Sequence, residues 1–361
     1  MADNLTINRL GGHVRLPWID WAKAVGIYLV VLGHMPVLYG KIYIYMFHMP
    51  FFFIISGFLF KPRPFKDECI KSFKRLIVPY WIYNLVLLAI ATCLLIITPE
   101  NELDSKAFTI GSQIRLMIFD IITGNLELMP YRFFRPLWFL ISLFIMRLVC
   151  CLVKEKHYWV LFSLTIAASI SLTITKTLQV GYTTDYFQIQ TTIVCLPFFL
   201  IGYFARKYKF IDRMETIPQV LKYVLLGVIM CGSVYIGYNN SFVNVFTCQT
   251  GKNIFVYYFV GIVISMLLLY LCSVLFTKRN GLIELVSKGT ILILGLHVVL
   301  IDGLIFPFHQ STISSVICSI VVMVICILLI SAVSKYMPIA LGDNSKSDTH
   351  KNNVRLSKKM K

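Results

Sequence analysis

Two histidines near the N-terminus lie in strongly apolar sequence, where an imidazole can take up a proton near neutral pH. His34 ends the stretch IDWAKAVGIYLVVLGH, which also holds Asp20 and Lys23, and His48 opens the stretch HMPFFFIISGF. Lys23 and His34 are eleven residues apart, so on a helix they lie near one face with a rise of about 16 Å. His34 is therefore a candidate general base, with His48, Lys23 and Asp20 as candidate catalytic partners. Other interpretations stay open: a structural hydrogen bond for His34 and an interfacial position for His48.

Several further polar or aromatic residues interrupt the apolar sequence and are candidates for substrate binding. Ser56 is followed by a glycine, a pair that is also typical of close packing between membrane helices. Arg132 and Arg135 lie in RFFRPLWFL, where they can bind an anionic group of a substrate or anchor lipid headgroups. An ionisable side chain inside the hydrocarbon costs roughly 2.5 to 3.5 kcal/mol, so a histidine kept there suggests a function. The candidate substrate-binding residues are Ser56, Arg132, Arg135, Trp138 and His297.

The composition decides which kind of element positions these side chains. Apolar types make up 58% of the 361 residues and charged types only 14%, and the mean hydropathy is +0.76. A soluble enzyme holds about a quarter of its residues as charges, so the composition excludes an ordinary cytosolic enzyme and equally a disordered chain. The net charge of +17 then indicates loops that face anionic lipid headgroups rather than a nucleic-acid surface. The polar residues are expected to lie on membrane-spanning helices.

Ten stretches qualify as spanning helices, which need about 20 mostly apolar residues. With the N-terminus in the cytoplasm, 26 of the 34 Lys and Arg residues fall on the inner side and seven on the outer side, while Arg147 stays inside the fourth stretch. This asymmetry follows the positive-inside rule. The sequence predicts an all-α polytopic membrane protein with about ten transmembrane helices and both termini in the cytoplasm. The predicted spans are residues 20–38, 43–60, 76–98, 136–153, 158–175, 187–204, 221–238, 254–276, 289–306 and 313–334.

The spans divide the chain into three parts. Residues 1–19 are predicted to form a cytoplasmic N-terminal tail, residues 20–337 the membrane domain, and residues 338–361 a basic cytoplasmic tail without fixed structure. Between the third and fourth spans, residues 114–122 are expected to form an amphipathic helix on the outer leaflet. The ten cysteines show no CxxC pair and no Cys/His ligand spacing, so neither a metal site nor a disulfide framework is predicted.

The chain resembles acyltransferase family 3, and within it the branch of fucose 4-O-acetylase-like proteins. The resemblance runs from about residue 18 to residue 335, and its short motifs occur in the same order. These motifs are DWAK at 20–23 followed after ten residues by His34, FHMPFFF at 47–53 with SGF at 56–58, RLIVPY at 75–80, PLWFL at 136–140, LPFFLIGY at 196–203, and a KGT segment that leads to His297.

The resemblance implies a multi-pass enzyme of the bacterial inner membrane that transfers an acyl group. The donor is commonly acetyl-CoA, used as a co-substrate, and the acceptor is a hydroxyl of a cell-envelope glycan or of its lipid-linked precursor. Membrane lipids are the other expected partners, and neither a metal nor a nucleic acid is expected. Many family members carry Arg at the position of Lys23, which keeps the charge here but lacks the bidentate guanidinium.

These implications lead to a mechanism in which the donor enters from the cytoplasm. Its phosphates are expected to bind the densest basic patch of the inner face, and its pantetheine arm, about 20 Å long by the reach of an extended chain, to extend towards His34. His34 then removes the proton of the acceptor hydroxyl, in a direct transfer. Asp20 is expected to pair with Lys23 or to shape the entrance, and Ser56, Lys23 or a tyrosine to stabilise the oxyanion. The patch consists of Arg63, Lys71, Lys74 and Arg75.

Three alternatives stay open at this stage. Succinyl transfer is one, because a cationic pocket near Arg132 or Arg135 can hold a second carboxylate. A transporter or flippase of lipid-linked sugars is another, although the internal repeats and paired broken helices typical of transporters are not evident in the sequence. A polytopic scaffold or sensor is the third, but it gives the intramembrane histidines no evident use.

Overall fold

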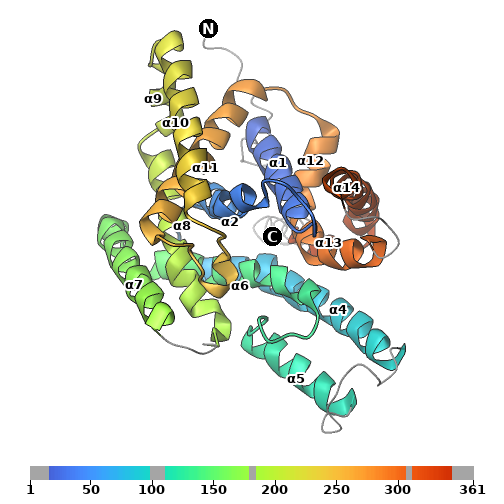
Figure 1. Cartoon of the computed structure of the whole chain (residues 1–361). Helices are drawn as coiled ribbons and strands as arrows, with labels where there is room; N and C mark the ends of the chain where they lie inside the picture. Colours follow the sequence, from blue (N-terminus) through green and yellow to red (C-terminus); the bar gives the residue numbers. More distant parts are fainter. Residues whose placement is uncertain (1–15, 98–109, 179–183, 306–310, 344–361) are drawn as a thin grey trace, which may run out of the picture.

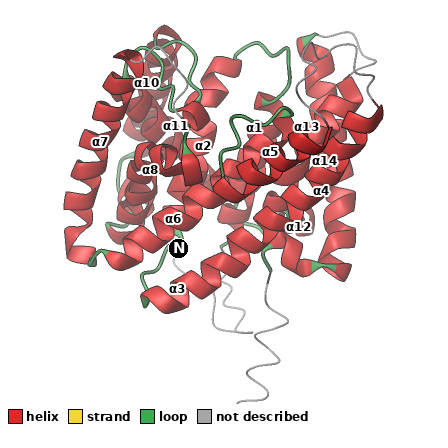
Figure 2. Ribbon diagram, turned by 90° about the horizontal axis from the view of Figure 1, so that it is seen from below, coloured by secondary structure: helices red, strands yellow, loops and turns green. Residues whose placement is uncertain are grey.

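Long apolar stretches dominate the chain, and in lipid such stretches fold as helices because every backbone polar group must find its partner within the segment. The computed structural model describes residues 16–97, 110–178, 184–305 and 311–343. Within these ranges the chain is almost entirely helical and has no strand, with one isolated β-bridge between Asn244 and Gln249. Short loops join the helices (Figure 2). The α-helices are α1 (Pro17–Gly33), α2 (Lys41–Phe58), α3 (Phe65–Ser72), α4 (Val78–Ile97), α5 (Ile110–Thr123), α6 (Trp138–Leu152), α7 (Tyr158–Leu178), α8 (Ile189–Lys207), α9 (Phe210–Glu215), α10 (Gln219–Asn239), α11 (Ile254–Leu275), α12 (Gly281–Lys288), α13 (Thr290–Ile305) and α14 (Thr312–Tyr336).

The prediction of an all-α membrane protein is confirmed, whereas the number of spans is confirmed only approximately. Across the described ranges, eight helical segments are long and apolar enough to cross a membrane, and a ninth is added if the bent pair α12 and α13, which meet at 76°, is one span. A helix also lies in each of the ten predicted stretches, but α1 has only 17 residues. The count of ten and the cytoplasmic position of both termini stay predictions.

Helix α2 lies in the middle of the bundle and packs against α1, α8 and α11 (Figure 1). The contact between α2 and α8 is close because it is made through two glycines. A Cβ atom on Gly57 would overlap the carbonyl oxygen of Phe199, and one on Gly202 would overlap the carbonyl oxygen of Ile54. The glycine after Ser56 therefore serves close helix packing, which is the interpretation that small residues in membrane helices favour.

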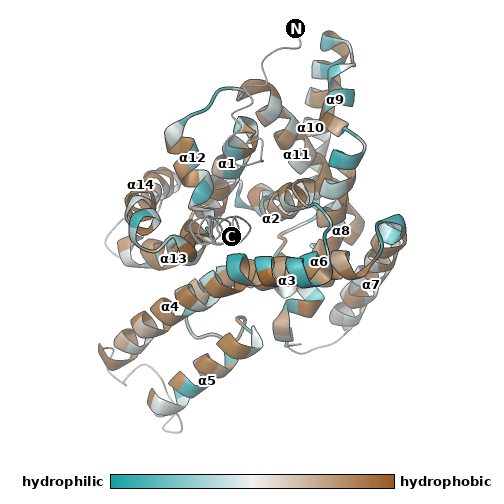
Figure 3. Ribbon diagram, turned by 180° about the vertical axis from the view of Figure 1, so that it is seen from behind, coloured by the Kyte–Doolittle hydropathy of each residue, from teal (hydrophilic) through white to brown (hydrophobic). Residues whose placement is uncertain are grey.

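Helices α3 and α4 form one continuous segment, Phe65–Ile97, in which a π-helical turn (η1, Phe73–Ile77) joins the two. Figures 1 and 3 show α4 and α5 side by side at one edge of the molecule. The Tyr80 hydroxyl of α4 donates a hydrogen bond of 2.7 Å to the carbonyl oxygen of Ile121 in α5. The predicted helix at 114–122 is thus confirmed as part of α5, and its place on the outer leaflet stays a prediction.

The folded part of the chain extends beyond the predicted end of the membrane domain. A 3₁₀ turn, η7 (Pro338–Leu341), follows α14 and buries Ala340 and Leu341. The Tyr83 hydroxyl donates to the carbonyl oxygen of Ala340 at 3.0 Å, and Lys288 pairs with Asp343 at 2.7 Å. The first residues of the predicted tail, 338–343, are therefore packed against the helices, because two apolar side chains after Pro338 are buried in the core. The division of the chain into a membrane domain and two tails stays a prediction. Residues 344–361 lie outside the described ranges, as do residues 1–15 of the predicted N-terminal tail.

Candidate active site

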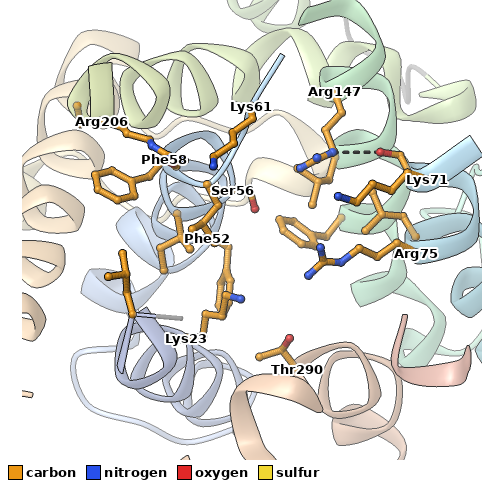
Figure 4. A pocket seen from close by; sticks show the side chains of 18 of the residues that line it. Lys23, Phe52, Ser56, Phe58, Lys61, Lys71, Arg75, Arg147, Arg206 and Thr290 are labelled. Carbon is orange, nitrogen blue, oxygen red and sulfur yellow. Dashed lines mark hydrogen bonds between the residues drawn. The ribbon is translucent and has the colours of Figure 1, made fainter. Parts of the chain in front are cut away.

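A cavity of about 710 Å³ lies among helices α1, α2, α3, α6, α8, α9 and α13, and we call it the basic cavity. Figure 4 shows part of its lining, with lysine and arginine side chains arranged around a common space. Asp212 is the only carboxylate among the described residues that line it. Such an excess of positive charge favours a polyanionic ligand. The cationic lining residues are Lys23, Lys61, Arg63, Lys71, Arg75, Arg147, Arg206 and Lys209.

The basic cavity brings together most of the residues predicted to bind the donor. Arg63, Lys71 and Arg75 line it, together with Lys23 of α1. Lys74 does not line it, although it precedes Arg75 directly. Lys71 of α3 and Arg75 of the π-helical turn fall on the face that borders the cavity, whereas Lys74 falls on another face. Lys74 is therefore not part of the site as the structure has it.

Arg147 of α6 is a member of this site that the sequence analysis did not assign. Its Nε donates to Glu68 Oε1 at 2.6 Å and to Ser72 Oγ at 3.1 Å, and its guanidinium carbon lies 5.2 Å from the centre of the Phe60 ring. The sequence did carry a signal, because an arginine inside an apolar span suggests a function by itself. The partner in α3 is distant along the chain and was not predictable.

A second cavity of about 190 Å³ lies near the other end of α1, and we call it the histidine cavity. It brings together five predicted residues from three segments of the chain. Phe242, Arg132 and Arg135 at its lining are exposed, so the cavity reaches the protein surface. Its other described lining includes Asn244, Val245 and Phe246, from a loop that no motif singled out. The five predicted residues are His34, His48, Arg132, Arg135 and Trp138.

His34 follows the last residue of α1 and is held by several neighbours. Its backbone N–H donates to the carbonyl oxygen of Val30 at 3.1 Å. The Lys41 ammonium donates to the carbonyl oxygen of Met35 at 3.0 Å, which fixes the turn after α1. The Tyr45 hydroxyl lies 3.5 Å from His34 Nδ1. Tyr45 is thus the tyrosine that lies next to the imidazole, and it was not singled out by sequence.

The other two histidines have defined hydrogen bonds. His48 Nδ1 lies 2.7 Å from the carbonyl oxygen of Ile44, and His297 Nδ1 lies 2.8 Å from that of Ile293. A carbonyl oxygen only accepts, so both rings carry their proton on Nδ1 when neutral, and Nε2 is the acceptor. The His297 ring is fully buried, and its centre lies 4.8 Å from that of His34. His297 therefore lies behind His34 rather than in the lining of the cavity, which differs from its predicted role in substrate binding.

The two arginines at the histidine cavity differ in their partners. Arg132 Nε donates to Asp302 Oδ1 of α13 at 2.8 Å, so its charge is paired. Arg135 has no acidic partner within the ranges that the structure describes. The guanidinium of Arg135 is therefore the one that can bind an anionic group here.

A small apolar cavity of about 40 Å³ lies between the two larger ones. Five of its lining residues also line the basic cavity, and three (Val30, Met49 and Leu294) also line the histidine cavity. The three cavities thus adjoin in a row beside α1, with Lys23 of α1 at one end of the row and His34, which follows α1, at the other. The helical rise between these two residues is about 16 Å. We call the small cavity the constriction.

Asp20 and Ser56 also lie outside the histidine cavity. Asp20 is buried and lines none of the three cavities, and its Oδ1 accepts a hydrogen bond of 2.6 Å from the Ser287 hydroxyl, which ties α1 to α12. Ser56 lines the basic cavity, eight residues along α2 from His48 and hence about 12 Å away in helical rise. Of the three expected oxyanion donors, only a tyrosine, Tyr45, lies beside His34.

Comparison with known proteins gives one match. The family described as an acyltransferase domain has a sequence model that matches residues 16–332. No curated protein and no solved structure matches the chain. The matched range includes every residue that lines the basic cavity, the constriction and the histidine cavity.

Proposed function

The chain belongs to this acyltransferase family and is a membrane acyltransferase, and from that premise we propose that it transfers an acetyl group from cytoplasmic acetyl-CoA. The acceptor is a hydroxyl of a cell-envelope glycan or of its lipid-linked precursor, as in the fucose 4-O-acetylase-like branch, and the membrane is the inner membrane of a bacterium. One observation carries the proposal: a basic cavity and a histidine cavity adjoin through an apolar constriction beside one helix.

The basic cavity suits the nucleotide end of coenzyme A. This end carries a pyrophosphate and a 3′-phosphate, and Lys and Arg side chains form the charge-assisted hydrogen bonds that such groups need. The cavity also borders the start of α1 and the end of α8, which the charge asymmetry of the loops assigns to the cytoplasmic side. The donor is available only on that side.

The constriction suits the pantetheine arm, which must bring the thioester from the basic cavity to His34. The distance to cover is about 16 Å along α1, and the arm reaches about 20 Å when extended. The lining is almost entirely apolar, from Ile27 and Phe52 to Leu294, so it excludes water from the path of the thioester. Exclusion of water limits hydrolysis of the donor.

The transfer step assigns the proton to His34. The Tyr45 hydroxyl lies 3.5 Å from His34 Nδ1. The proposed step uses the tautomer with the proton on Nδ1, facing this hydroxyl, so that Nε2 is free to accept the proton of the acceptor hydroxyl. The hydroxyl oxygen forms a bond to the thioester carbon, the carbon–sulfur bond then breaks, and the imidazolium returns the proton to the leaving thiolate. The products are the acetyl ester and free coenzyme A. No covalent enzyme intermediate is needed.

A second candidate is succinyl transfer, which one observation favours. Arg135 has no acidic partner among the described residues and borders the histidine cavity. A guanidinium in that position can bind the second carboxylate of a succinyl group. The mass of the transferred group distinguishes this candidate from acetyl transfer.

Mass spectrometry of the surface polysaccharide tests the proposal, using cells with and without this chain. We expect the sugars to lose one acetyl group per modified unit while the glycan itself is still made and exported. Loss of a succinyl group instead supports the second candidate. Loss of the whole glycan supports a transporter or flippase, and an unchanged glycan contradicts both the transfer and the transport functions.

A further inference from the structure

Glu68 of α3 has no exposed surface, yet it contacts three residues that line the basic cavity. Its Oε1 accepts hydrogen bonds of 2.6 Å from Arg147 Nε and 2.6 Å from the Ser72 hydroxyl. Its Oε2 lies 3.3 Å from Arg63 Nε. Glu68 itself does not line the cavity, so it lies behind the cationic residues that do.

Glu68 holds the guanidinium of Arg147 by a hydrogen bond and that of Arg63 by an ion pair. In both arginines the closest contact to Glu68 is through Nε, but only the contact with Arg147 has the geometry of a hydrogen bond. A guanidinium is planar and rigid, so holding Nε of Arg147 sets the direction of its terminal amino groups. Arg147 is held from a further side by the Phe60 ring, 5.2 Å from its guanidinium carbon, and by Ser72 Oγ at 3.1 Å. The terminal donors are thereby preorganised for a ligand in the cavity.

We propose that Glu68 is a positioning residue that orients Arg63 and Arg147 to bind the phosphate groups of the acyl donor. The inference rests on the proposed function, because the donor is there a coenzyme A thioester. A phosphate needs two or more donors aimed at it, and bidentate binding depends on the geometry of the fork as well as on its charge. Without Glu68 the two arginines keep their charges but lose this fixed direction.

The sign of the effect distinguishes positioning from simple electrostatics. Replacement of Glu68 by glutamine removes a negative charge and makes the cavity more positive, so electrostatics alone predicts tighter binding of a polyanion. Positioning predicts weaker binding in spite of the added positive charge. Asp212 offers a matched control, because it is an exposed carboxylate that lines the same cavity. Among the described residues, it forms no ion pair with Arg63 or Arg147.

The experiment measures the affinity of the full-length protein for acetyl-CoA in lipid nanodiscs, by calorimetry, together with KM and kcat for acetyl transfer. We expect Glu68→Gln to weaken acetyl-CoA binding about tenfold or more, the loss typical of a charged hydrogen bond, and to raise KM while kcat at saturation changes little. Asp212→Asn removes a carboxylate from the lining of the same cavity and is expected to bind acetyl-CoA more tightly than the unaltered protein. If Glu68→Gln binds as tightly as the unaltered protein, or if Asp212→Asn loses affinity equally, the positioning role is overturned.

A second variant covers the case in which Glu68→Gln does not fold. Arg147→Lys keeps the positive charge but cannot present a rigid fork to Glu68 and a phosphate together. We expect it to weaken acetyl-CoA binding by a similar factor, and unchanged binding overturns the inference. If the unaltered protein does not bind acetyl-CoA, the proposed donor and the inference are both overturned. If the unaltered protein binds acetyl-CoA and the variants bind it equally well, only the role of Glu68 is overturned.

Discussion

Leu294 of α13 lines both the constriction and the histidine cavity, but not the basic cavity, so its replacement by tryptophan closes the proposed path at one point. The constriction measures about 40 Å³, and one water takes about 10 to 15 Å³ by the same measure, so there is room for roughly three. Tryptophan adds about six heavy atoms to leucine, more than this space holds. The thioester then stops short of His34, and a misplacement of this kind lowers turnover by at least about 100-fold, or about 2.7 kcal/mol.

The assay compares two variants in lipid nanodiscs, with acetyl transfer and the binding of 3′,5′-adenosine diphosphate as separate readouts. Leu294→Trp is expected to lose transfer while the nucleotide still binds in the basic cavity. Leu294→Ala leaves the path open and is the control. Both variants are destabilised, by about 1 to 3 kcal/mol for overpacking and about 2 to 5 kcal/mol for the truncation, so Tm is recorded for each. Turnover by Leu294→Trp at the level of the unaltered protein, or an equal loss in Leu294→Ala, refutes the proposed path.

Three further predictions concern single contacts. Tyr45→Phe removes the hydroxyl that lies 3.5 Å from the imidazole and is expected to lower kcat about 3- to 10-fold, the worth of one neutral hydrogen bond, with KM for acetyl-CoA unchanged. Arg75→Ala is expected to weaken acetyl-CoA binding about 10- to 100-fold, whereas Lys74→Ala, which alters a side chain outside the cavity, leaves it unchanged; equal effects of the two in calorimetry count against the site. Gly57→Ala forces α2 away from α8 and is expected to lower the free energy of unfolding by about 1 to 3 kcal/mol, whereas Gly227→Ala meets nothing within 4 Å and leaves Tm in detergent unchanged.

Hydropathy and charge were sufficient to predict the all-α membrane fold, because a bilayer leaves an apolar stretch few alternatives to a helix. The predicted span 289–306 begins at Gly289, the residue that separates α12 from α13. The sequence analysis did not predict the short helix α12 before it, nor the angle of 76° at which the two helices meet. Such a bend depends on packing, here on Ile330 of α14, whose side chain occupies the space that a Cβ on Gly289 would need.

The sequence singled out many residues of the candidate site, but it did not predict that they divide between two cavities. Helical spacing predicted that Lys23 and His34 lie near one face of a helix, and in the structure Lys23 lines the basic cavity and His34 the histidine cavity. Spacing within one helix does not reveal how far its neighbours are shifted along the bundle. For that reason Ser56 was expected near the substrate and lies in the basic cavity, and His297 was expected to bind substrate and lies behind His34.

Contacts between distant segments account for the rest. Arg147 was recognised as a charge inside an apolar span, but its role depends on Glu68, which is 79 residues away along the chain. The loop that contributes Phe242 and Asn244 to the histidine cavity carries no chemical motif of its own. Sequence patterns with a short period report on single helices, and only the folded chain brings these residues together.

The most direct test of the account replaces His34 by alanine and measures acetyl transfer from labelled acetyl-CoA to the acceptor glycan by the protein in lipid nanodiscs. Loss of a general base lowers the rate by about 10²- to 10⁴-fold, and the account predicts a loss in this range while acetyl-CoA binding in the basic cavity stays within twofold of the unaltered protein, roughly 0.4 kcal/mol. Transfer by His34→Ala at a rate within a few-fold of the unaltered protein contradicts the account.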